Sequence, residues 1–251
     1  MKKFSTPNNL LELQENIQEI RHKIELVCQR VGRSAKDVRL LPVTKTLPVQ
    51  RVEQAYRLGF ASFGENKVLE AQAKYEALQH LPIHWILIGH LQSNKVKYAV
   101  KFIDEFHALD SIKLAEKLNR RLLSEKRQLN VFIQVNTSAE QSKFGVTPEE
   151  TLLLIEQCQE LSQLKIIGLM TLAIHSQDLV QVRRCFRTLR LLREEINKIY
   201  PEIQRLSMGM SSDFEVAIEE GATDIRIGQA IFGQRALPDD HYWAESGNSH
   251  G

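Results

Sequence analysis

The chain alternates between short apolar runs and amphipathic stretches over most of its 251 residues. Apolar residues recur every three or four positions over 8–31, which predicts an amphipathic helix that ends at Gly32. Beyond it, short apolar runs predict strands, and segments rich in helix-forming residues predict helices between them. The expected strands are 38–45, 60–66, 83–89, 102–110, 129–136, 164–172, 203–209 and 224–228, and the expected helices are 48–59, 67–79, 94–100, 111–125, 147–161, 178–200 and 212–221.

The order of these elements indicates the class of fold. Eight expected strands with helices between nearly all of them favour parallel strands joined by crossover helices. Their number and the chain length fit a single α/β domain, a (β/α)8 or TIM barrel with an extra N-terminal helix. An open doubly wound sheet is the alternative. We expect the domain to span 1–240 and the patternless residues 241–251 to form a disordered tail.

Residues at the expected helix starts add local detail. Ser111 precedes one helix and Thr147 another, and Thr147 with Glu150 has the spacing of a capping box. Ser212 and Asn66 each stand where a side chain could cap the helix that follows. We expect caps at Ser111 and Thr147, whereas caps at Ser212 and Asn66 are the alternative to a ligand-binding role of those segments.

Composition narrows the possible functions. The chain has 33 Lys and Arg against 31 Asp and Glu, so its near-zero charge gives no general attraction to nucleic acid. Three widely spaced cysteines (Cys28, Cys158 and Cys185) favour a reducing compartment over a disulfide framework. The N-terminus lacks the apolar run of a secretory signal, and no apolar stretch approaches the roughly 20 residues of a membrane span. We expect a soluble cytoplasmic protein.

Polar residues and glycines gather at the expected carboxyl ends of the strands, which form the working face of a TIM barrel. Lys45 ends the apolar run LLPVTK. It is either a strand-exit lysine whose ammonium reaches water, or a desolvated amine able to form a Schiff base with an aldehyde. GEN at 64–66 and GHLQSNK at 89–95 fit ordinary turns as well as site loops, and His90 fits the barrel rim.

The last two expected strands end in further candidate site residues. SMGMSSD at 207–213 is a turn before a helix, where free N–H groups favour an anion, although a capped helix alone explains the pattern. Arg226 lies within a strand and implies either a buried ion pair or a ligand contact. Gly228 allows the backbone to approach a ligand. The helix at 178–200 carries arginines that form a solvated face or, alternatively, a macromolecular contact: Arg183, Arg184, Arg187, Arg190 and Arg193.

The ordered set of these motifs resembles a known family. VTKT, GEN, GHLQSNK, KFGV, GLM, SMGMSSDFEVAI and TDIRIGQAIFG occur in the register of the pyridoxal phosphate homeostasis protein (YggS/PROSC-like) family, over about residues 8–234. The family's fold is similar to the N-terminal barrel domain of alanine racemase, a fold-type III pyridoxal 5'-phosphate (PLP) protein. Strand one carries VTKT where many members have a serine before the lysine, and Thr44 keeps the hydroxyl.

The resemblance implies a set of cofactor-binding residues. Lys45 would carry PLP as an internal aldimine, and Asn66 would lie beside the cofactor. Ser211 and the backbone at Gly228 and Gln229 would hold the phosphate. Arg226 would face the pyridine nitrogen. Met210, in the same turn as Ser211, is also counted among the residues expected to contact the cofactor.

The implied function is PLP binding for intracellular PLP (vitamin B6) homeostasis, with effects on amino-acid and keto-acid pools, rather than catalysis. A permanently protonated arginine leaves the pyridine nitrogen uncharged and the ring a weaker electron sink. A barrel also uses nearly all of the chain and leaves no second domain to complete a racemase site. We expect a monomer whose partners are PLP and apo PLP-dependent enzymes, with no nucleic acid, membrane or metal.

Other functions remain open from the sequence. A minimal PLP-dependent amino-acid racemase is the main alternative. A Schiff-base aldolase or sugar-phosphate isomerase could use the same face of the barrel. An interaction protein that works through the arginine-rich helix is a further possibility.

Overall fold

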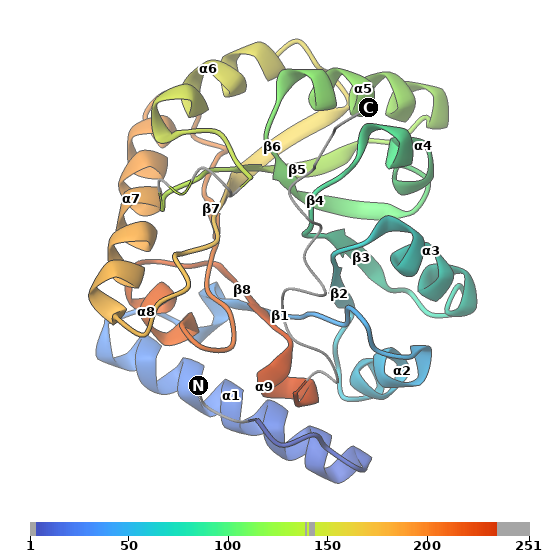
Figure 1. Ribbon diagram of the computed structural model, residues 1–251, viewed down its shortest axis with the longest axis vertical. Coiled ribbons are helices and arrows are strands. Elements are labelled where there is room, and N and C mark those ends of the chain that lie inside the picture. The colour runs from blue at the N-terminus through green and yellow to red at the C-terminus, as the bar shows by residue number, and fades with distance from the viewer. Residues whose placement is uncertain (1–3, 139, 141–143, 235–251) are drawn as a thin grey trace.

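The computed structural model describes residues 4–138, 140 and 144–234, and it shows a barrel of parallel strands surrounded by helices (Figure 1). The strands are β1 (Arg39–Pro42), β2 (Ser62–Glu65), β3 (His84–Leu87), β4 (Ile103–Leu109), β5 (Leu129–Gln134), β6 (Leu164–Met170), β7 (Arg205–Ser207) and β8 (Asp224–Ile227). The eight strands pair in parallel in the order β1-β8-β7-β6-β5-β4-β3-β2. A parallel bridge between Val43 and Gly64 brings β1 beside β2. The TIM barrel is therefore confirmed, and the open-sheet alternative is wrong.

The helices lie outside the barrel. They are α1 (Leu10–Arg30), α2 (Val49–Arg57), α3 (Val68–Ala77), α4 (Val96–Ala99), α5 (Ile112–Glu125), α6 (Pro148–Cys158), α7 (Leu179–Asn197), α8 (Phe214–Glu219) and α9 (Gln229–Phe232), with 3-10 turns at Ala35–Asp37 and Ser93–Lys95. The expected segment 94–100 is divided between the second 3-10 turn and α4. The short helix α9 was not expected, because four residues give no detectable periodicity.

The expected N-terminal helix is present as α1, and it packs on the outside of the barrel beside the last helices of the chain. Its apolar stripe, which includes Leu13, Ile17, Ile20 and Ile24, is buried. Figure 1 shows α1 running beside α8 and α9. The Asn16 side chain donates a hydrogen bond to Ile231 O at 3.0 Å and so joins α1 to α9.

The helix starts agree only in part with the sequence. Thr147 and Glu150 form the expected capping box on α6. Ser111 occupies the N-cap position of α5, but its side chain makes no capping hydrogen bond. The alternative of a helix cap at Ser212 or Asn66 is wrong, because α8 begins after Asp213 and α3 begins after Lys67. Asn66 is thereby left at the strand end rather than in a helix cap.

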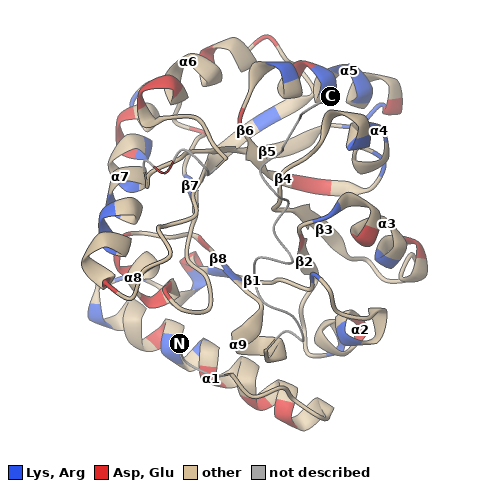
Figure 2. Ribbon diagram, viewed as in Figure 1, with Lys and Arg blue, Asp and Glu red and all other residues tan. Residues whose placement is uncertain are grey.

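The arginine-rich helix is not simply a solvated face. Both signs of charge lie along the outer helices (Figure 2). Arg183 of α7 forms ion pairs with Glu219 and Glu220, and Arg187 and Arg190 also contact Glu220. These arginines join α7 to α8 and so have a structural role.

Two expectations from composition can be compared with the structure. Cys28, Cys158 and Cys185 are buried free thiols, in agreement with the absence of a disulfide framework. Within the ranges described above, no helix combines the length and apolarity that crossing a bilayer requires. The tail at 241–251 lies outside the described residues.

Candidate functional site

A cavity of about 1490 Å³ opens at the carboxyl ends of the strands. Its lining comes from the segments that follow most of the strands and from α1. The structure brings together on this cavity all seven residues that the sequence singled out: Lys45, Asn66, Met210, Ser211, Arg226, Gly228 and Gln229. Their contact with a cofactor stays a prediction, but their convergence is a fact of the fold.

Lys45 is placed by the pairing of the first and last strands. Pro42 is in register with Ile227, and Val43 N donates to Ile227 O at 2.9 Å. On the other side, Thr44 N donates to Gly64 O at 3.0 Å. Parallel strands end at the same rim, so Lys45 lies between the loops that follow β2 and β8. The residue is only 7% exposed, which agrees with the desolvated amine rather than with the solvated strand-exit lysine.

Asn66 reaches the cavity because a glycine allows two loops to pack closely. A Cβ atom at Gly89 would lie 2.4 Å from Asn66 O, so no side chain fits there. Ile88 N donates to Glu65 O at 2.9 Å and continues the β2–β3 pairing up to this point. The GEN and GHLQSNK motifs therefore form one wall of the cavity.

The turn after β7 and the start of α9 form the opposite wall. Ser211 Oγ accepts a hydrogen bond from Ala230 N at 3.2 Å, and Met210 N donates to Asp213 Oδ1 at 2.6 Å. Gln229 is the first residue of α9, where helical geometry provides no acceptor for the N–H group. The Ser211 hydroxyl proton and the Gln229 N–H group give the wall hydrogen-bond donors that suit an anion.

Gly228 lies on the cavity wall at a position where the fold has room for a side chain. An added Cβ atom there would contact only Val43, with its nearest atom 3.4 Å away, which is ordinary van der Waals contact. The residue has φ −108°, a value that any L-residue adopts. A side chain would instead occupy space on the cavity wall. The expected approach of a ligand to the Gly228 backbone stays a prediction.

Arg226 presents a buried cation to the cavity. Its Nη1 donates to Ser207 Oγ at 2.7 Å, and its Nη2 donates to Thr171 O at 2.9 Å. Burial lowers the pKa of Arg226 to about 10, while Asp213 and Asp224 act in the opposite direction. The guanidinium is therefore protonated at neutral pH, and it has more N–H groups than these two bonds use. Such a group suits an acceptor atom of a ligand.

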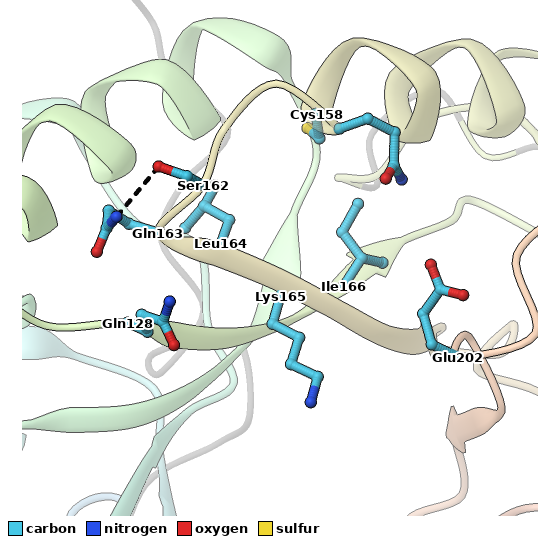
Figure 3. Close-up of a pocket in the computed structure, with 9 residues that line it drawn as sticks. Gln128, Cys158, Ser162, Gln163, Leu164, Lys165, Ile166 and Glu202 are labelled. Carbon is cyan, nitrogen blue, oxygen red and sulfur yellow. Dashed lines mark hydrogen bonds between the residues drawn. The ribbon is translucent and has the colours of Figure 1, made fainter.

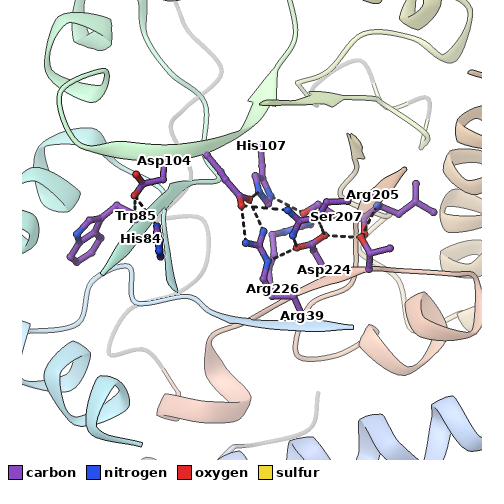
Figure 4. Close-up of polar contacts among 12 residues, drawn as sticks. Arg39, His84, Trp85, Asp104, His107, Arg205, Ser207, Asp224 and Arg226 are labelled. Atoms are coloured by element: carbon purple, nitrogen blue, oxygen red, sulfur yellow. Dashed lines mark hydrogen bonds and ion pairs between the residues drawn. The ribbon is translucent and has the colours of Figure 1, made fainter. Parts of the chain in front are cut away.

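Behind Arg226, a polar network fills the barrel interior (Figure 4). His107 Nδ1 lies 2.9 Å from Ser207 Oγ, and His107 Nε2 lies 2.9 Å from Glu105 Oε2. Burial lowers the pKa of His107, so the imidazole is neutral at pH 7. Nε2–H then donates to Glu105, and Nδ1 accepts the Ser207 proton. Ser207 in turn accepts from Arg226, and the hydrogen bonds run in one direction from the cavity to Glu105.

Glu105 is the anionic end of this network. Burial alone raises the pKa of Glu105, but hydrogen bonds from His107 and Arg39 outweigh it and hold the pKa well below its usual range. Arg39 contacts both carboxylate oxygens at 2.9 and 2.6 Å, and it also pairs with Asp224. β4 and β8 are not neighbours in the sheet, so these side chains meet across the barrel.

Sequence reasoning missed several residues of the site and its support. Glu105 and His107 are two positions apart in the strand that also contains Asp104, and this spacing was a usable signal that both face the barrel interior. Asn16, Glu19 and Lys23 of α1 also line the cavity. Nothing in the periodicity of α1 distinguishes those positions from an exposed face.

His90 lies on the cavity wall, where its ring stacks on Phe144 with centroids 4.2 Å apart. Its place at the rim agrees with the sequence expectation. Another pocket, of about 270 Å³, lies at the amino-terminal end of β6 and includes Ser162, Gln163 and Cys158 (Figure 3). It is at the opposite end of the barrel and contains none of the expected site residues.

The geometry favours an organic ligand with an anionic group. The cavity combines a buried amine, a donor-rich turn and a buried guanidinium. Across the described ranges, no group of three or more His, Cys, Asp or Glu residues is placed to hold a metal ion. An aldehyde that carries a phosphate and an acceptor nitrogen matches these three features.

Comparisons with known proteins agree with the motifs. The family model described as alanine racemase, N-terminal domain, matches residues 16–236. The pyridoxal phosphate homeostasis protein of Aquifex aeolicus is 41% identical over 222 residues, which cover 88% of this chain and 97% of that protein. The protein of the same name from Escherichia coli (strain K12) is 37% identical over 227 residues, or 89% and 97% of the two chains.

Solved structures extend the agreement to the fold. PipY of Synechococcus elongatus with PLP bound has a TM-score of 0.78 at 33% identity, with 88% of this chain and 100% of that chain covered. A protein from Bifidobacterium adolescentis described as unknown has a TM-score of 0.86 at 32% identity, with 92% and 98% covered. Alanine racemase of Clostridium difficile, at 14% identity and a TM-score of 0.69, shares the fold over 57% of its length. The chain belongs to the pyridoxal phosphate homeostasis protein family, within the wider alanine racemase N-terminal domain family.

Proposed function

We propose that this protein binds PLP at the carboxyl end of its barrel and serves intracellular PLP homeostasis. The observation that carries the proposal is the position of Lys45, a buried lysine between Asn66 on one side and the Gly228 backbone on the other. The names of the relatives and the PLP in PipY support the choice of ligand. The cavity has room and polar groups for each part of that molecule.

Lys45 is the residue that holds the aldehyde end. Its Nζ forms the bond to the aldehyde carbon as a Schiff base, and the aldehyde oxygen leaves as water. The barrel places Lys45 close to the rim and keeps it largely out of solvent. Asn66, on the next strand end, orients the ring side of the ligand.

Ser211 and the backbone N–H groups of Gly228 and Gln229 hold the phosphate. The Ser211 hydroxyl is already oriented by Ala230 N. Gly228 leaves space for phosphate oxygens to approach the backbone. Met210 belongs to the same turn as Ser211 and lines the cavity. The two ends of the ligand are thus fixed by β1 and by the segments after β7 and β8, which are neighbours in the closed barrel.

Arg226 donates a hydrogen bond to the pyridine nitrogen. When bound, PLP supplies an aldehyde and a ring that can withdraw electrons from an attached amino acid. Arg226 keeps its proton because burial lowers its pKa only to about 10. The network through Ser207 and His107 holds the guanidinium in place. The ring nitrogen stays uncharged. This arrangement suits storage and delivery of PLP to apo enzymes, which would affect amino-acid and keto-acid pools, better than carbanion chemistry.

The test is the ultraviolet-visible spectrum of the purified protein with added PLP, before and after borohydride. We expect an absorbance band of the lysine-bound cofactor and, after reduction, a label on Lys45 in peptide mass spectra. The variant Lys45→Ala loses both signals, while Lys95→Ala, which removes another lysine of the cavity wall, keeps them. A wild-type protein that stays colourless and unlabelled would refute the proposal.

A minimal amino-acid racemase is the alternative that uses the same cavity. It requires deuterium exchange at the α-carbon of an added amino acid, which is lost in Lys45→Ala. We expect a spectrum without such exchange. Exchange at a rate well above that of free PLP would replace the carrier function by the enzymatic one.

A further inference from the structure

A buried ionic cluster lies behind Lys45, on the outer side of the barrel wall. Lys74 of α3 is 4% exposed, and its Nζ lies 2.6 Å from Thr44 O, 2.7 Å from Glu65 Oε1 and 2.7 Å from Glu70 Oε1. These three acceptors use all three protons of the ammonium group. The Thr44 hydroxyl also donates to Glu65 Oε1 at 2.6 Å.

The same cluster holds the peptide that follows Lys45. Thr46 N donates a hydrogen bond to Glu70 Oε1. Thr46 has φ +66°, a left-handed conformation that a β-branched residue adopts only when its surroundings impose it. Lys74 therefore fixes the carbonyl before Lys45, and Glu70 fixes the amide after it. Both contacts come from one helix.

The cluster itself is a poor source of stability. Glu65 is 1% exposed, and its Oε2 has no hydrogen-bond partner among the described residues. Burial raises the pKa of Glu65 to about 7 in spite of Lys74 and Thr44. Buried ion pairs are often no more stabilising than apolar side chains of the same volume. The cluster needs another explanation, and its contacts on both sides of Lys45 supply one.

We infer that Lys74 is a positioning residue, which with Glu70 fixes the backbone on both sides of Lys45 and so keeps Lys45 Nζ in place for the cofactor. The inference rests on the proposed function. Thr44, Glu65 and Lys74 are absent from the described residues that line the cavity. An effect of Lys74 on the cofactor therefore passes through the groups that it contacts, which are the backbone next to Lys45 and Glu70, itself a residue of the cavity wall.

The experiment compares Lys74→Met with Glu65→Gln. Both substitutions disrupt the Lys74–Glu65 ion pair, but only Lys74→Met removes the contact with Thr44 O. The readout is the rate at which added PLP becomes linked to Lys45. Samples are quenched with borohydride at successive times, and peptide mass spectrometry measures the labelled fraction of Lys45. The proteins are compared at PLP concentrations that give them equal occupancy of the cavity. We expect Lys74→Met to slow linkage by about tenfold or more, because small displacements of a reacting group have effects of this size. We expect Glu65→Gln to stay close to wild type.

Arg183→Met is the matched control. Arg183 also connects a barrel helix to two glutamates, Glu219 and Glu220, but it does so on α7, away from Lys45. Its loss should leave the linkage rate unchanged even if it lowers the melting temperature. Equal slowing in Lys74→Met and Glu65→Gln, or no slowing in Lys74→Met, would overturn the inference, because either result assigns Lys74 a structural role only.

Hydrogen–deuterium exchange of the wild-type protein tests the same contacts without a substitution. The Thr46 amide should exchange far more slowly than other amides of exposed loops, since it donates to Glu70. Free exchange of that amide would contradict the inference even if Lys74→Met fails to fold. Failure of the wild-type protein to take up PLP would refute the proposed function instead, and the Thr46 measurement would still decide whether the backbone is held.

Discussion

A single hydroxyl group, that of Ser207, joins the cavity to the interior of the barrel. It accepts a hydrogen bond from Arg226 and donates one to His107, and the residue is fully buried. The sequence placed Ser207 at a strand end but did not show that Arg226 and His107 are its partners. They come from β4 and β8, and only closure of the barrel brings them together.

The substitution Ser207→Ala should therefore be costly for its size. It leaves Arg226 Nη1 and His107 Nδ1 without their partner, and an unpaired buried polar group costs about 1–3 kcal/mol. Urea denaturation monitored by circular dichroism measures the free energy of unfolding. Thr188→Ala, which removes an exposed hydroxyl that bonds to its own helix at Arg184 O, should change that free energy by less than about 0.5 kcal/mol. Equal effects at the two sites would contradict the network.

Glu65 makes stability depend on pH in a defined direction. Its pKa is raised from 4.5 in the unfolded chain to about 7 in the folded protein. Between these values the folded protein binds a proton that the unfolded chain has released. The stability contributed by protonated Glu65 is complete below pH 4.5 and is lost as the pH rises toward 7.

Unfolding free energies of wild type and Glu65→Gln at pH 5 and pH 8 check this expectation. The unfolding free energy of Glu65→Gln minus that of wild type should increase as the pH rises from 5 to 8, because glutamine does not ionise. It should then stay constant above pH 8. A difference that is independent of pH from 5 to 8 would show that Glu65 is ionised throughout.

At the scale of elements, periodicity predicted every described strand and every described α-helix except α9, while the ends were less well defined. The first strand ends at Pro42, three residues before the expected Lys45. Val43, Thr44 and Lys45 continue toward the rim through single hydrogen bonds and a bridge. Hydrophobicity does not distinguish a residue that pairs in a strand from one that extends past it, so such ends require the tertiary structure.

Helix capping gives a test at this scale. Thr147→Ala removes a capping box on α6 and should lower the free energy of unfolding by about 1 kcal/mol. Ser111→Ala is the control at the corresponding position of α5, where the hydroxyl makes no capping hydrogen bond. We expect little change there. A loss at Ser111 as large as that at Thr147 would show that the two caps are equivalent in solution.

At the scale of the whole molecule, the alternation of strands and helices was enough to predict the barrel and the rim that carries the site. The sequence alone predicts that Lys45, Asn66 and Gly228 meet at that rim, because each follows a strand and the carboxyl ends of parallel barrel strands share one face. The contribution of α1 to the cavity was not predictable. It depends on how a helix outside the repeating pattern packs against α8 and α9.

Gly168 and Gly228 have different roles: the packing of the barrel needs the first, whereas we expect the second to matter for ligand binding. A Cβ atom at Gly168 would lie 2.3 Å from Arg205 O and 2.7 Å from Phe132, so Gly168→Ala should lower the unfolding free energy by about 1–3 kcal/mol. Gly228→Ala should leave stability nearly unchanged but weaken PLP binding severalfold, measured by absorbance titration. Normal PLP affinity in a folded Gly228→Ala protein would argue against phosphate at this backbone.

The docking of α1 also has a consequence for biosynthesis. Asn16 and its acceptor on Ile231 are 215 positions apart, and Arg33 reaches the carbonyl of Ile218, 185 positions away. Ribosomes add about 5–20 residues per second. The apolar face of α1 is therefore synthesised about 10–40 s before the residues of α8 and α9 that cover it. We therefore expect chaperones to bind the exposed apolar face of α1 during most of translation.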